Sequence, residues 1–86
     1  MEIHKEFPFY VEQNGERTTG TMDFLAMNDS NIILIDYKTD NAPETEIRQR
    51  YSPQLKTYMK ALSIMYPGKE IKAYAYSFHH ESFIQI

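Results

Sequence analysis

The chain has 86 residues, 42% of them apolar, and a formal net charge of -3 at pH 7. This length suits one domain over residues 1–86 with a small core, and the absence of cysteine excludes disulfides and cysteine-bound metal centres. The slight acidity argues against a protein that coats nucleic acid by charge alone. No apolar run is long enough to span a membrane and the charged first residues are unlike a signal peptide, so we expect a cytoplasmic protein without membrane contact.

The first predicted element is an edge strand that leads into a hairpin turn. Residues 6–12 alternate between apolar and polar side chains, as a strand does. Pro8 lacks a backbone donor, so this strand should lie at the edge of a sheet. Asn14 and Gly15 predict a tight type I′ hairpin turn, because both central positions of that turn need positive φ.

A second hairpin follows. Two apolar runs, residues 20–27 and 32–37, flank four turn-forming residues at 28–31. This pattern predicts antiparallel strands in which Met27 pairs with Ile32. Together the two hairpins make a three-stranded antiparallel meander.

The two hairpin registers bring acidic residues into one row. Asp23 lies across from Asp36, about 5 Å away on the same face, and Glu6 lies on the other side of Asp23. Lys38 follows Asp36 by two residues and projects from that face too. Carboxylates this close repel one another unless a cation lies between them, and a divalent metal is the natural occupant. The alternative is a set of ordinary strand-end acids with Lys38 as their salt-bridge partner.

The face opposite the acids is the predicted core face. A slip of one residue in either hairpin would move the acids to the core side. The expected core face carries the apolar side chains Phe7, Phe9, Val11, Met22, Phe24, Ile33, Ile35 and Tyr37.

Residues 41–50 show no clear period and are expected to form a loop, and a helical turn at 44–50 is the alternative for its second half. A loop beside the acidic row is a reasonable place for substrate contact. Arg48, Arg50 and Lys56 could contact phosphates there. The alternative is that each is an ordinary solvated charge.

One helix is predicted after this loop. Ser52 suits the N-cap and Pro53 the first helical position, and residues 66–68 contain a stop signal. Gln54 and Tyr58 are four residues apart, so they are neighbours on the helix surface and can reach the same point. The apolar side chains recur at helical spacing: Leu55, Tyr58, Met59, Leu62 and Met65.

Two further strands complete the predicted fold. Residues 70–78 alternate, and because a helix precedes them, this strand should return parallel to a strand of the meander by a right-handed crossover. Residues 82–86 suggest a short last strand. The fold class is therefore α/β (α+β), with one helix and a mixed sheet.

Three motifs resemble a known family. They are Gly20-x-x-Asp23, Asp36-Tyr37-Lys38-Thr39 and Tyr51-x-x-Gln54-Leu55-x-x-Tyr58. In this order they resemble the nuclease domain of the RecB and AddA helicase-nucleases, in the PD-(D/E)xK (restriction-endonuclease-like) superfamily, over residues 6–78. The resemblance implies a restriction-endonuclease-like core.

The resemblance also implies roles for particular residues. Asp23 and Asp36 would bind Mg²⁺ or Mn²⁺, and the backbone carbonyl of Tyr37 would complete the shell. Lys38 would orient or activate the attacking water. Two helix residues, Gln54 and Tyr58, would position the site or the DNA strand. For Glu6, the predicted row suggests support of the metal or its water, and a solvated edge-strand acid is the alternative.

The implied function is metal-dependent hydrolysis of DNA, as the nuclease module of a helicase-nuclease in DNA end processing and recombinational repair. The implied partners are DNA and a helicase domain or subunit. The second hypothesis is a non-catalytic relic of the fold that binds DNA or a protein. A third is an unrelated small α/β interaction domain.

Two features depart from the family pattern. Met22 stands where the superfamily's name has proline. The family's fold also begins with a helix that packs on the sheet, whereas five residues precede Glu6 here. We therefore expect a fragment or minimal version of the domain, or a second copy of the chain that covers the sheet in a homo-oligomer.

Overall fold

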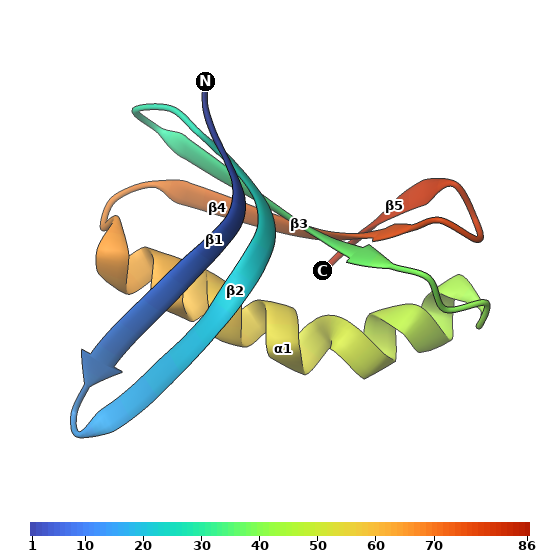
Figure 1. Cartoon of the computed structure of the whole chain (residues 1–86), viewed down its shortest axis with the longest axis horizontal. Helices are drawn as coiled ribbons and strands as arrows, with labels where there is room; N and C mark the ends of the chain where they lie inside the picture. Colours follow the sequence, from blue (N-terminus) through green and yellow to red (C-terminus); the bar gives the residue numbers. More distant parts are fainter.

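The computed structural model describes residues 1–86 as five strands and one helix (Figure 1). The strands form one sheet in the order β1-β2-β3-β4-β5, in which β4 is parallel to β3 and the other neighbours are antiparallel. This arrangement confirms the predicted fold class, the meander, the parallel return and the short last strand. The elements are β1 (Glu2–Gln13), β2 (Glu16–Met27), β3 (Asn31–Lys38), α1 (Glu44–Met65), β4 (Glu70–Ser77) and β5 (Ser82–Gln85).

Both hairpins have the predicted turns and registers. Asn14 and Gly15 have φ values of 53° and 78°, as a type I′ turn requires. In the second hairpin Met27 pairs with Ile32. The side chain of Asn28 accepts hydrogen bonds from two backbone N–H groups of the turn, at 2.9 and 2.8 Å. These local interactions fix the register of β2 against both of its neighbours.

The ladder between β1 and β2 is interrupted at Glu6. Lys5 pairs with Phe24 and Phe7 pairs with Met22, but no pairing joins Glu6 to Asp23 between them. Glu6 has a φ of 50°, which turns its backbone out of the extended conformation, and its side chain is exposed. The expected row of three acids is therefore wrong at Glu6.

The core lies on the face of the sheet that α1 covers (Figure 1). In β3 the buried positions are Ile32, Leu34 and Asp36, whereas the residues between them point to the other face. The predicted core face is therefore wrong for Phe24, Ile33, Ile35 and Tyr37. The predicted core face is right beyond the interruption at Glu6, where Phe9, Val11 and Met22 are buried. The interruption changes which face of the two strands is turned to the helix.

Helix α1 begins at Glu44, nine residues before the predicted first helical residue, Pro53. Pro43 occupies the N-cap position, and Pro53 lies inside the helix instead of at its first position. Ile47 is fully buried with Leu55 in the core, so burial outweighs the hydrogen bond that Pro53 removes. The predicted end is confirmed, with Tyr66 as C-cap. The helix lacks the length of apolar sequence that a membrane crossing would need.

No element covers the opposite side of the sheet, which we call the open face (Figure 1). Its aromatic rings pack edge-on or tilted against one another and remain partly in water: Tyr37, Phe78 and Phe83 are 45%, 53% and 59% exposed. The residues that line the open face are Phe24, Ile33, Ile35, Tyr37, Tyr74, Tyr76, Phe78 and Phe83.

Candidate functional site

Asp23 and Asp36 lie side by side where β3 nears its end. Asp36 is 6% exposed, and Asp23 is half-buried. An Asp23 carboxylate oxygen accepts a hydrogen bond from the backbone N–H of Tyr37 at 2.9 Å, which fixes Asp23 against β3. Burial raises the pKa of Asp36, the Asp23 carboxyl raises it further, and Lys38 partly offsets both effects. The predicted juxtaposition of the two acids is present in the structure.

Lys38 connects this acid pair to the helix. Its Nζ lies 2.7 Å from Asp36 Oδ2 and 3.5 Å from Gln54 Oε1. The Gln54 amide nitrogen in turn donates to the hydroxyl of Tyr58 at 3.3 Å. Four of the predicted site residues therefore form one chain of polar contacts from β3 to α1.

One oxygen of this site is buried without a hydrogen bond. Asp36 Oδ2 is shielded from water and accepts no hydrogen bond, because the close ammonium of Lys38 forms an ion pair without hydrogen-bond alignment. The Lys38 ammonium offsets part of the cost of burying this carboxylate, and the oxygen keeps acceptor capacity that a metal ion could use. Hard carboxylate oxygens are the ligands that Mg²⁺ prefers. The donor set of Asp36 and Asp23 therefore fits a divalent cation.

The ligand set stops at these two acids. No group of three His, Cys, Asp or Glu side chains gathers anywhere in the structure, and Glu6 stays exposed outside the ladder. A cation here would complete its shell from backbone carbonyl groups, water or substrate, as Mg²⁺ commonly does. The expected contributions of Glu6 and of the Tyr37 carbonyl stay predictions.

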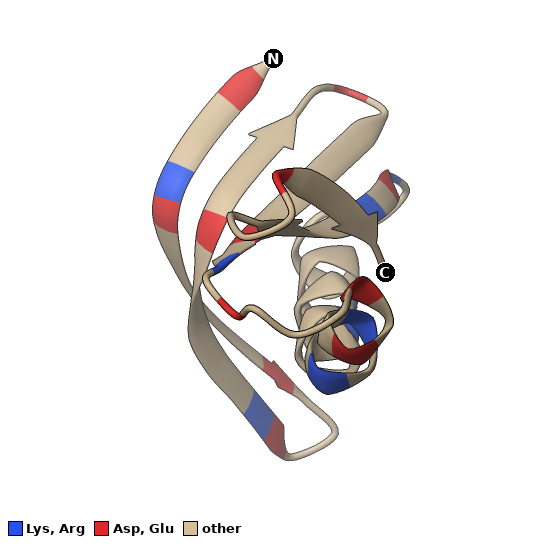
Figure 2. Cartoon of the chain, turned by 90° about the vertical axis from the view of Figure 1, so that its right-hand side faces the viewer, with Lys and Arg blue, Asp and Glu red and all other residues tan.

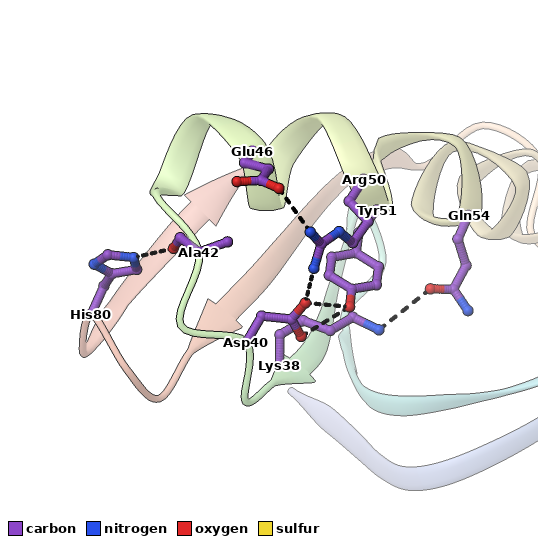
Figure 3. A network of polar contacts seen from close by, with 8 residues as sticks. All are labelled: Lys38, Asp40, Ala42, Glu46, Arg50, Tyr51, Gln54 and His80. Atoms are coloured by element: carbon purple, nitrogen blue, oxygen red, sulfur yellow. Dashed lines mark hydrogen bonds and ion pairs between the residues drawn. The ribbon is translucent and has the colours of Figure 1, made fainter.

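A second polar network lies beside Lys38 (Figure 3). The Tyr51 ring centroid is 4.0 Å from Lys38 Nζ, and the Tyr51 hydroxyl donates to the Asp40 carboxylate, whose oxygens are 2.9 and 2.8 Å away. Arg50 pairs with the same carboxylate and with Glu46. The Tyr51 hydroxyl, and then Arg50, hold the pKa of Asp40 below its ordinary value. This network ties the loop after β3 to the first turns of α1.

Comparison with known families gives one match over almost the whole chain. Residues 1–84 match the family model described as the PD-(D/E)XK nuclease superfamily. The chain belongs to this superfamily. The resemblance inferred from the three motifs is confirmed.

Similar PD-(D/E)XK chains occur within much longer proteins. One is an ATP-dependent helicase/nuclease subunit of Clostridium botulinum (strain Alaska E43 / Type E3), 36% identical over 87 residues, which cover 100% of this chain and 7% of that protein. The protein of the same name from Anoxybacillus flavithermus is 32% identical over 85 residues, covering 88% of this chain and 7% of that protein. The one from Lactiplantibacillus plantarum is 32% identical over 98 residues, covering 98% and 8%. The chain thus spans less than a tenth of the length of these relatives.

Gly20 has a steric reason to open the first PD-(D/E)XK motif of this chain. A Cβ at this position would lie 3.0 Å from a ring carbon of Phe9 and 3.1 Å from the Tyr58 hydroxyl. A side chain at this position would require Phe9 or Tyr58 to shift by a few tenths of an ångström, so Gly20 permits the close approach of β2 and the helix at Tyr58. The sequence offered the motif but not this contact.

Two arginines of α1 have partners within this PD-(D/E)XK chain, which the sequence did not show. Arg50 is held by Asp40 and Glu46, and Arg48 Nε donates to the Gln85 backbone carbonyl at 3.1 Å. Acidic and basic residues lie next to one another in the first turns of α1 (Figure 2). Residues 44–50, predicted as a loop with a possible helical turn, are therefore the first turns of α1, and Arg48 and Arg50 make contacts within the chain. Contact of Arg48, Arg50 or Lys56 with phosphate stays a prediction.

Proposed function

We propose that this chain is a nuclease module that hydrolyses the phosphodiester bonds of DNA with Mg²⁺ or Mn²⁺. The observation that carries the proposal is the buried Asp36 oxygen, which accepts no hydrogen bond, lies beside Asp23 and is 2.7 Å from Lys38. The superfamily supports the reaction class, because its nucleases generally use divalent metals. The relatives named as helicase/nuclease subunits support DNA end processing in repair as the setting, with a helicase domain or subunit as partner.

The metal would be held by carboxylate oxygens of Asp36 and Asp23, with the Tyr37 carbonyl and the substrate phosphate as further oxygen ligands. When bound, a divalent cation supplies positive charge for the phosphate oxygens and lowers the pKa of nearby water. Burial disfavours the ionised form of Asp36, and a bound cation would offset this cost.

The residues of the chain account for the orientation of the reactants. Lys38 is confined between Asp36 and Gln54, so its ammonium can meet the phosphate or the attacking water from a fixed position. In a site shielded from water, one such charge stabilises developing negative charge more than it would in bulk solvent. Gln54, fixed by Tyr58, prevents the ammonium from swinging away from the helix.

One observation favours a second function. The Lys38 ammonium already lies against Asp36 Oδ2, so the carboxylate has a positive neighbour before any metal binds. A non-catalytic relic that binds DNA or a protein would hold its site in this way. In that case the chain would retain the fold and lose the metal.

The test is a cleavage assay on linear duplex and single-stranded DNA with Mg²⁺, with Mn²⁺ and with a chelator. We expect cleavage by the wild-type chain that the chelator abolishes, and none by Asp36→Ala or Lys38→Ala. Asp29→Ala and Lys72→Ala are matched controls, because both residues are exposed and lie outside the site. They should cleave at the wild-type rate.

Two results would contradict the nuclease proposal. Cleavage that persists in a purified Asp36→Ala variant would show that the assigned site is wrong. A folded wild-type chain that cleaves neither form of DNA with either metal would favour the relic.

A further inference from the structure

The Lys38 ammonium is enclosed on three sides. Asp36 and Gln54 provide two of them, at 2.7 and 3.5 Å from Nζ. The third is the ring of Tyr51, whose centroid lies 4.0 Å from Nζ. An ammonium within about 6 Å of a tyrosine ring face is attracted by the ring quadrupole. The proposed function gives Tyr51 no role, although it touches the same ammonium.

The far end of the Tyr51 ring is fixed as well. Its hydroxyl donates to the Asp40 carboxylate, and Arg50 pairs with that carboxylate (Figure 3). The Tyr51 hydroxyl and Arg50 lower the pKa of Asp40, so both contacts favour its ionised form. A hydroxyl that donates to a carboxylate is polarised toward the ring, which makes the ring face more attractive to a cation. Asp40 thus orients the ring and strengthens its hold on Lys38.

We propose that Asp40 and Tyr51 form a positioning pair that holds the Lys38 ammonium where the phosphate would meet it. This inference rests on the proposed function, which gives Lys38 its task. Neither member of the pair touches the substrate, and both act through Lys38. The helix explains the spacing, because residues three apart lie on one face, so the Tyr51 ring and the Gln54 amide reach the same ammonium.

The direct test is the NMR signal of the Lys38 Cε protons in the full chain, without DNA or metal. Cε is bonded to Nζ, which lies 4.0 Å from the Tyr51 ring centroid, so the signal of these protons should appear upfield of the other lysines in the wild type. In Tyr51→Phe, which keeps the ring but loses its hydrogen bond to Asp40, the signal should be displaced less. It should return to the ordinary position in Tyr51→Leu. Tyr66→Leu is the matched control, because Lys69 Nζ lies 5.8 Å from the Tyr66 ring, and this variant should leave the Lys38 signal unchanged.

Kinetics give a second readout. With Mg²⁺ and DNA, Tyr51→Leu should lower kcat about tenfold at unchanged KM, the size expected from one lost cation–π contact. Tyr51→Phe keeps the ring but loses the hydrogen bond to Asp40, so it should lower kcat less than Tyr51→Leu does. Asp40→Asn keeps the shape of the side chain and should lower kcat severalfold while moving the Lys38 signal toward its ordinary position. This variant decides the question if Tyr51→Leu does not fold.

Different results overturn different proposals. A Lys38 signal that is the same in the wild type and Tyr51→Leu, or full kcat in Tyr51→Leu, would overturn the positioning pair. If Tyr51→Leu is unfolded, an unchanged signal in Asp40→Asn does the same. A wild-type chain that shows the displaced signal but cleaves no DNA would overturn the proposed function and leave the Lys38–Tyr51 contact established.

Discussion

Strand β3 contributes one row of side chains to the face that α1 covers and the other row to the open face. On the covered face Leu34 is fully buried and Asp36 is 6% exposed, whereas on the open face Tyr37 is 45% exposed. The difference comes from the helix, which shields one row of the strand and not the other (Figure 1). Asp36 owes its raised pKa and its shielded oxygen to this cover.

The charged residues of the proposed site lie on the covered face, where their interactions are stronger. A charge on the open face would be solvated and weak, because water screens it. At the end of the covered face, Asp36 and Lys38 interact across 2.7 Å with most of the water excluded. The proposed site therefore depends on the helix twice, for its dry environment and for the side chains of Tyr51, Gln54 and Tyr58.

The largest expected difference between the faces is in stability. Leu34→Ala removes a fully buried side chain and should lower the free energy of unfolding by about 2–5 kcal/mol. Ile35→Ala, the next residue on the same strand but on the open face, should cost about 1 kcal/mol or less, because its side chain is only half-buried. Urea unfolding of both variants measures the two values. Equal losses would contradict the assignment of the faces.

A closer contact on the covered face should give a smaller effect. Gly20→Ala places a methyl group 3.1 Å from the Tyr58 hydroxyl, so the helix or the ring must shift. We expect a loss of about 1–3 kcal/mol in the free energy of unfolding, as for other overpacked positions, together with slower cleavage. Gly15→Ala is a poor control because of its positive φ, whereas Thr19→Ala changes an exposed neighbour in β2. Wild-type stability in Gly20→Ala would show that the contact is not tight.

The smallest expected effect is a pH dependence. The pKa of Asp36 is raised in the folded state above its ordinary value of 3.8, so the folded chain binds this proton more tightly than the unfolded chain. The contribution of Asp36 to stability therefore decreases as the pH rises from about 4 through the raised pKa, and is constant above it. Asp36→Asn should lack this decrease, which thermal unfolding across pH 3–8 would detect. A steeper decrease in Asp36→Asn than in the wild type would contradict the assignment.

The sequence predicted the sheet better than the faces of the sheet. Asn14-Gly15 and the turn after Met27 fixed both hairpin registers locally, and the helix before β4 required its parallel return. The covered face of β3 could not be predicted because residues 32–35 are all apolar. Without alternating polar and apolar side chains, the sequence does not show which row of the strand is buried. The acids were placed on the solvent side, whereas burial of Asp36 is what the structure shows.

The helix and the second network were harder to foresee for different reasons. Ser52-Pro53 has the composition of a helix start. The helix instead begins at Glu44, because its first turns bury Ile47 in the core. The acid pair and Lys38 were predictable because strand pairing sets their positions. The contact between Lys38 and Tyr51 depends on how α1 lies over β3, which no local pattern determines.

Binding of Mn²⁺ measured by titration calorimetry tests the central claim most directly, because it asks whether Asp23 and Asp36 hold a cation whether or not DNA is cleaved. We expect one Mn²⁺ bound per wild-type chain, no binding at this site in Asp36→Asn, and wild-type binding in Asp29→Asn, which changes an exposed acid in the turn after β2. No Mn²⁺ binding by the wild-type chain, or equal binding by Asp36→Asn, would contradict the assignment of the metal site.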